Sequence, residues 1–211
     1  GSLADGQIIV DAGDSDVVEI DFKTVEIACS YGAPVLILNA DKVEISAKKD
    51  TKNIIIDKRT TCEETDETAA AIYSECDLKI KGNGELSVKT SLNNGIHTKD
   101  DLDLKNLTLY VSAPNHAIKG NDSITCENAT ITAVSTGGDT LKTSNSDISD
   151  KGNQRGTVTV NGGSLELYAC CDGIDAAYDV IITDEAKVTI YTNTYSSYTT
   201  ERVEKSESTM Y

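Results

Sequence analysis

One short segment recurs along this chain at intervals in the low twenties of residues. The best-formed copy is Asn94–Leu102, and the next copy, His116–Ile124, begins 22 residues later. Shorter copies follow at Asp139–Lys142 and Asp172–Asp175. Each copy has a small residue, an aliphatic residue and a polar residue before a strand-like stretch. Such a period is typical of solenoids, in which equivalent residues of successive turns lie next to one another.

The aliphatic residues of the copies predict two columns of core side chains. The first contains Ile72, Ile96, Ile118, Leu141 and Ile174. The second contains Val43, Leu78, Leu102, Ile124, either Ile148 or Val158, and Val180. Short stretches of alternating apolar and polar residues, rich in β-branched side chains, run from Gln7–Val10 to Lys187–Tyr191 and predict strands throughout.

Three short strands per turn predict an all-β chain, folded as a right-handed parallel β-helix (solenoid) with turns of about 22 residues. We expect a single domain over residues 1–211, with 192–211 as a C-terminal cap or loosely ordered tail. An antiparallel sandwich built from hairpins is the alternative. The recurrence of like residues in the same order favours parallel stacking. Cys126 falls at a core position, and Cys62 with Cys76 is a candidate disulfide.

Polar residues of the copies form columns whose neighbours should lie about one strand spacing, roughly 4.8 Å, apart. Two carboxylates at that distance repel by roughly 3–4 kcal/mol at an effective dielectric near 20. A calcium ion relieves this repulsion, and its oxygen ligands fit the spacing. The main candidate ligands are Asp139, Asn145, Asp147, Asp150, Asp172 and Asp175, and a second group includes Asp100, Asp101 and Asp122. The alternative is that these residues only form turns and cap ladder ends.

Cationic and aromatic residues beside the acidic columns are candidates for carbohydrate binding. These are Lys119, Lys142, His97 and, as part of an aromatic platform with Tyr195 and Tyr198, Tyr191. A lysine beside a metal-bound uronate is also a candidate base for β-elimination. The simpler interpretation is that Lys119 and Lys142 are charge partners of Asp122 or Asp139.

The net charge of −16 excludes classes of partner. So acidic a surface repels nucleic acid and anionic membranes and suits multivalent cations, although scattered acids also serve solubility alone. No stretch has the roughly 18 apolar residues of a membrane span, and no signal peptide is visible, so we expect no membrane insertion.

Five motifs together resemble a bacterial carbohydrate-binding family: Leu3–Asp14, Asn39–Val43, Gly95–Leu102, Asp139–Asn145 and Asp172–Ala176. The resemblance implies a secreted or surface-attached right-handed parallel β-helix with bound calcium, associated with cellulose and acid sugars such as polygalacturonate. It also implies a fold similar to family 9 pectate lyases, and supports Asp139, Asp172 and Asp175 as calcium ligands. The run Ala169-Cys170-Cys171 departs from the small or glycine residues usual there.

We therefore expect a non-catalytic extracellular module that binds plant cell-wall polysaccharide and is stabilised by calcium. Calcium-dependent polyuronate lyase activity, with Lys119 or Lys142 as base, is the enzymatic alternative. A third possibility is a surface adhesin in which calcium has a purely structural role.

Overall fold

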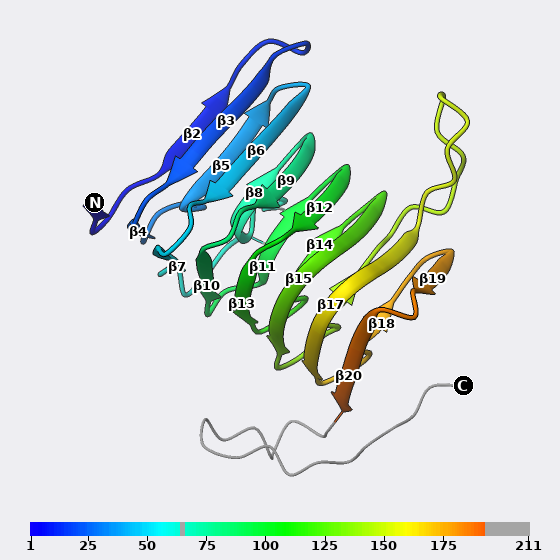
Figure 1. The fold of residues 1–211 in the computed structure, drawn as a ribbon. Coiled ribbons are helices and arrows are strands. Elements are labelled where there is room, and N and C mark those ends of the chain that lie inside the picture. Colours follow the sequence, from blue (N-terminus) through cyan, green and yellow to red (C-terminus); the bar gives the residue numbers. More distant parts are fainter. Residues whose placement is uncertain (64–65, 193–211) are drawn as a thin grey trace.

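The computed structural model of the protein describes residues 1–63 and 66–192. These residues form twenty β-strands and no helix, so they contain no helix that crosses a membrane. Each circuit of the chain adds strands to three faces, and the circuits stack in sequence order (Figure 1). The last predicted element, the tail, lies outside the described residues from position 193 onward and stays a prediction.

The first face is a seven-stranded sheet formed by β2 (Ile8–Asp11), β5 (Val35–Asn39), β8 (Ala70–Ser74), β11 (Asn94–Thr98), β14 (Ile118–Gly120), β16 (Leu141–Lys142) and β18 (Ile174–Asp175). The second contains β3 (Val17–Phe22), β6 (Lys42–Ala47), β9 (Asp77–Lys81), β12 (Asp101–Lys105) and β19 (Asp179–Ile182). The third contains β1 (Ser2–Leu3), β4 (Glu26–Cys29), β7 (Lys52–Asp57), β10 (Glu85–Thr90), β13 (Thr108–Ala113) and β20 (Ala186–Thr192). Two long strands, β15 (Ser123–Ser135) and β17 (Thr157–Ala169), run through the second and third faces and unite them as one thirteen-stranded sheet.

All pairs between the named strands are parallel. On each face, a strand pairs with the equivalent strand of the circuits before and after it, as β11 does with β8 and β14. This arrangement is β-helix-like and differs from the antiparallel sandwich considered as the alternative. The isolated antiparallel bridge between Ile148 and Gln154 belongs to a loop, residues 143–156, that projects from the coil (Figure 1).

The corner between the second and third faces is made by residues with left-handed backbone. Positive φ angles occur at Asp50, Asn106 and Asn128, and Gly162 takes the equivalent position in β17. Asn, Asp and Gly tolerate this conformation better than other residues. The polar stretches around Asn128 and Gly162 therefore bend β15 and β17 at this corner without ending either strand.

Both predicted aliphatic columns are confirmed. Ile72, Ile96, Ile118, Leu141 and Ile174 are successive partners on the first face, and all except Ile174 are fully buried. The second column continues from Ile124 to Val158, whereas Ile148 lies in the projecting loop with 66% of its surface exposed. Each buried aliphatic side chain contributes roughly 1.5–3 kcal/mol. Cys126 is buried as expected, while Cys62 and Cys76 are free thiols and do not form the disulfide considered above.

Candidate functional site

Asn94, His116, Asp139 and Asp172, which begin successive copies of the repeat, form a ladder of side chains that accept backbone hydrogen bonds. Asn94 Oδ1 accepts from the His116 N–H at 3.2 Å, and His116 Nδ1 accepts from the Asp139 N–H at 3.2 Å. Asp139 Oδ1 in turn accepts from the Asp172 N–H at 2.9 Å. Each side chain thus ties one turn to the next, which is a structural role independent of any ligand.

Asp139, Asp172 and Asp175, here called the C-terminal triad, come together as expected. One carboxylate oxygen from each lies within 4.8 Å of the others. Lys142 occupies this group: its Nζ contacts Asp175 Oδ2 and lies 3.7 Å from Asp139 Oδ2. The contact with Asp175 raises the pKa of Lys142, so the ammonium stays charged. The charge of the C-terminal triad is therefore already partly neutralised by a side chain of the protein.

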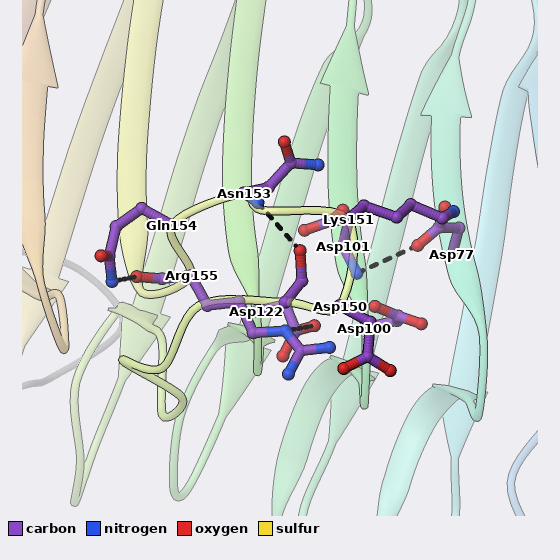
Figure 2. A pocket seen from close by; sticks show the side chains of 10 residues that line it. Asp77, Asp100, Asp101, Asp122, Asp150, Lys151, Asn153, Gln154 and Arg155 are labelled. Carbon is purple, nitrogen blue, oxygen red and sulfur yellow. Dashed lines mark hydrogen bonds and ion pairs between the residues drawn. The ribbon is translucent and has the colours of Figure 1, made fainter.

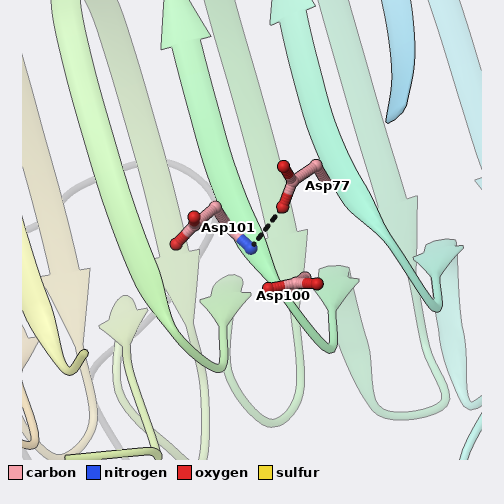
Figure 3. A group of neighbouring side chains, drawn as sticks. All are labelled: Asp77, Asp100 and Asp101. Atoms are coloured by element: carbon pink, nitrogen blue, oxygen red, sulfur yellow. Dashed lines mark hydrogen bonds between the residues drawn. The ribbon is translucent and has the colours of Figure 1, made fainter. Parts of the chain in front are cut away.

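A second group of carboxylates, Asp77, Asp100 and Asp101, lies at the bend between the first and second faces (Figure 3). We call it the corner triad. Asp77 and Asp101 begin β9 and β12, and Asp100 precedes Asp101 at the bend. One oxygen from each lies within 4.8 Å of the others, and the Asp101 N–H donates to Asp77 Oδ1 at 3.3 Å. Within the described ranges, no lysine or arginine forms an ion pair with these three carboxylates.

The corner triad carries excess negative charge. Partial burial, a hydrogen bond with Asp122 and the charge of Asp77 together raise the pKa of Asp100 to about 6. Burial and the charge of Asp101 also raise the pKa of Asp77. Both shifts have the direction expected for partly buried carboxylates that repel one another.

The projecting loop folds over the corner triad and borders an open hollow of about 260 Å³ (Figure 2). Its ends are fixed by backbone hydrogen bonds, from the Asn145 N–H to Asn121 O at 2.8 Å and from the Gly156 N–H to Asp122 O. Asp150 and the exposed Lys151 line the hollow together with the triad and Asp122. The structure thus adds Asp150 to the predicted group of Asp100, Asp101 and Asp122.

The six residues predicted as one calcium site are therefore divided between two places. Asn145 donates from Nδ2 to Asp122, and Asp147 pairs with Arg155 at 2.9 Å. Arg155 Nε also lies 2.5 Å from Asp122 Oδ2, an ion pair without a well-directed hydrogen bond. Asn145, Asp147 and Asp150 lie on the side of the corner triad because the loop turns back over earlier circuits.

Asp77 is the member of the corner triad that the predicted ligand set lacked. Its position 24 residues before Asp101, opposite it in the strand register, was the available signal.

The candidate carbohydrate-binding residues His97, Lys119 and Lys142 lie in register on the first face, in one column with the buried Tyr73 and with Asp175. The His97 ring meets Tyr73 edge-on with centroids 5.4 Å apart, and its Nε2 lies 3.3 Å from Asn121 Oδ1. Burial lowers the pKa of His97 to about 4. Lys119 is half-buried beside it.

Tyr191 lies on the third face and away from this column. It is largely buried, with its ring stacked on Tyr168 at 4.7 Å between centroids. Tyr195 and Tyr198, the other members of the predicted platform, lie outside the described residues.

Three comparisons with known proteins bear on this site. A family model described as carbohydrate-binding domain-containing protein matches residues 1–210. A carbohydrate-binding domain-containing protein of Acetivibrio thermocellus is 34% identical over 116 residues, which is 54% of this chain. The match covers 41% of that relative, so the chain spans less than half of its length.

A solved structure from C. thermocellum, described as the gadolinium derivative of a polysaccharide lyase-like protein, is similar throughout. It has a TM-score of 0.80 and 31% identity, over 92% of this chain and 77% of the other. The family match extends over nearly the whole sequence, and the fold agrees with that of the lyase-like structure. The chain belongs to the carbohydrate-binding domain-containing protein family.

Proposed function

We propose that this chain is a non-catalytic module that binds plant cell-wall polysaccharide, cellulose or polygalacturonate-type acid sugars, with the help of calcium at the corner triad. The observation that carries the proposal is the meeting of three aspartates at an accessible bend, where no lysine or arginine of the described residues forms an ion pair with them. Secretion or display on a bacterial cell surface follows from such a ligand. We also infer that the coil is a right-handed β-helix solenoid, because parallel crossovers have that hand.

Calcium suits the corner triad better than other common metals. Its ligands are oxygens at about 2.3–2.6 Å, so two ligands on opposite sides of the ion lie up to about 4.8 Å apart. The three carboxylates satisfy this limit, and no histidine or cysteine belongs to the group. Gadolinium is another hard cation that prefers oxygen, and the description of the related structure as a gadolinium derivative is in keeping with this chemistry.

An ion held by the corner triad would keep free coordination positions. Calcium takes about six to eight oxygen ligands, and three aspartates supply only some of them. A sugar carboxylate would be able to take one of the other positions. The aspartates of the corner triad would then hold the ion that attracts the sugar, which would let a protein of net charge −16 retain an anionic polymer.

Polyuronate lyase activity is the second candidate. The likeness to a polysaccharide lyase-like structure favours it, as does Lys119, whose pKa is lowered by burial and by Lys142. A lowered pKa suits a general base. Lys142 is the weaker candidate for a base, since its aspartate partners raise its pKa.

The test is retention on insoluble cellulose and on calcium-crosslinked polygalacturonate, with and without chelator, while absorbance follows unsaturated product. If the chain is a non-catalytic module, the polysaccharide should retain the protein only in calcium, and no unsaturated product should form. Product that accumulates with turnover and disappears in Lys119→Ala establishes the lyase instead. Absence of both, with melting still lowered by chelator, indicates an adhesin whose calcium is structural.

A further inference from the structure

Lys119 differs from Lys142 and Lys99, the other lysines near the first face, because none of the described side chains pairs with it. Lys142, on the next strand, is held by Asp139 and Asp175, and Lys99, at the neighbouring bend, contacts Glu67 and Glu75. Across the described part of the chain, Lys119 forms no hydrogen bond or ion pair with any side chain, although it is half-buried. A partly desolvated ammonium without a counter-ion is costly, and a bound anion removes that cost.

His97 supplies a second, independent sign of a missing ligand. Only 7% of the residue is exposed, and its Nδ1 is buried with no hydrogen-bond partner among the described residues. Nε2 faces the amide oxygen of Asn121, an acceptor, so Nε2 carries the proton and Nδ1 is a bare acceptor. Buried polar atoms are almost always paired in folded proteins. Nδ1 of His97 is therefore an unsatisfied acceptor among the described residues, and a hydrogen-bond donor would stabilise it.

Lys119 is a candidate donor for this nitrogen. The two residues are cross-strand partners in β11 and β14, and the ammonium is close enough to contribute to the lowered pKa of His97. An ammonium has three protons to donate and rotates on a flexible stem. One proton satisfies Nδ1, which leaves the others for an acceptor that arrives from solvent.

We propose that Lys119 and His97 form a docking point for the carboxylate of an acidic sugar residue, in which Lys119 donates to the carboxylate and the bare Nδ1 of His97 positions the ammonium. This inference rests on the proposed function and deepens it. It assigns direct recognition of the uronate to the outer surface of the first face, separate from the calcium bridge at the corner triad. It also predicts preference for acidic over neutral glycans, because a neutral sugar leaves the ammonium unpaired.

The test is calorimetric titration, in calcium, of trigalacturonate and of a neutral cello-oligosaccharide into four proteins. These are the wild type, Lys119→Met, Lys119→Arg and the control Lys89→Met. Lys89 is an exposed lysine of β10, on a different face. For Lys119→Met we expect the Kd for trigalacturonate to rise about ten- to a hundred-fold, as for loss of a charge-assisted hydrogen bond. Lys119→Arg should recover most of the affinity, and Lys89→Met should match the wild type.

Two further measurements separate the possible failures. Calcium should raise the melting temperature of Lys119→Met as much as that of the wild type, which shows that the variant is folded and its corner triad is intact. On lysines labelled by reductive ¹³C-methylation, trigalacturonate should shift the Lys119 resonance. Unchanged affinity of Lys119→Met, or an unmoved Lys119 resonance, overturns the inference and leaves the proposed function standing. A wild type that binds neither oligosaccharide overturns both.

Discussion

Replacing Asp100 by asparagine should affect stability in opposite directions with and without calcium. The substitution keeps the size of the side chain and removes one charge from the corner triad. Raising the pKa of Asp100 from its ordinary 3.8 to about 6 corresponds to a penalty of up to about 3 kcal/mol for the ionised carboxylate. Asp100 is partly exposed, so solvent screening reduces this to about 1–2 kcal/mol. Without metal, Asp100→Asn should be more stable than the wild type by that amount at pH 7.5.

Calcium should reverse the order of stability, so that the wild type becomes more stable than Asp100→Asn. At a calcium concentration of about a hundred times Kd, binding stabilises the wild type by about 2.7 kcal/mol. The variant lacks one anionic ligand and should gain little at the same concentration. One kcal/mol shifts the melting temperature of a chain this long by roughly 2–4 °C. Thermal denaturation should therefore show the variant melting about 2–8 °C higher in chelator, and lower than the wild type in calcium.

The difference in stability between Asp100→Asn and the wild type in chelator should also depend on pH. Since the folded-state pKa of Asp100 is raised, ionisation costs stability, and the wild type loses stability as pH rises from about 4 to 6. The advantage of Asp100→Asn in chelator should vanish near pH 4. Asp179→Asn is the control, because Asp179 is an exposed aspartate whose strand position corresponds to that of Asp101, next to Asp100. It should change stability by less than about 0.5 kcal/mol. A variant that is less stable in chelator at pH 7.5, or that responds to calcium like the wild type, refutes the reasoning.

Three other substitutions give independent predictions. Lys142→Met should destabilise the calcium-free protein by about 1–3 kcal/mol and increase calorimetric calcium stoichiometry by one, because it exposes the C-terminal triad; unchanged stoichiometry contradicts this. The folded-state pKa of His97 is lowered from 6.5 to about 4. The stability that neutral His97 contributes is therefore complete above pH 6.5 and is lost as the pH falls toward 4. Urea unfolding should show that His97→Gln loses less stability than the wild type between pH 6.5 and 4. Equal losses in the two proteins contradict this prediction. Gly163→Ala should cost more than about 2 kcal/mol, because φ is +86° and a Cβ would lie 2.2 Å from Ala129 O; Gly152→Ala, with φ +82° in open space, should cost less.

The periodic parts of the fold could be predicted from the sequence because stacking repeats a local pattern. The spacing of Ile96 and Ile118 identified cross-strand partners directly. The motif itself, however, forms β11 and β14 of the first face, although its Gly, Asn and Asp residues have little preference for strands. Hydrogen bonds to the neighbouring circuits override that local preference.

The candidate site was less predictable because it depends on a non-periodic insertion. The direction of the loop from Thr143 to Gly156 is fixed by contacts such as Arg155 with Asp122, which no repeat spacing encodes. The same holds for Lys142, whose side-chain contacts with Asp139 and Asp175 partly neutralise the C-terminal triad. The spacing of Asp77 and Asp101 was visible in the sequence. Only the folded arrangement shows that neither forms an ion pair with a lysine or arginine of the described residues.

The most direct test of calcium at the corner triad is a crystal structure grown with calcium and trigalacturonate, with anomalous scattering used to locate the metal. We predict an anomalous peak about 2.3–2.6 Å from carboxylate oxygens of Asp77, Asp100 and Asp101, with the remaining positions filled by water or a sugar carboxylate. A peak confined to the C-terminal triad, or no peak at the corner triad at saturating calcium, contradicts the account.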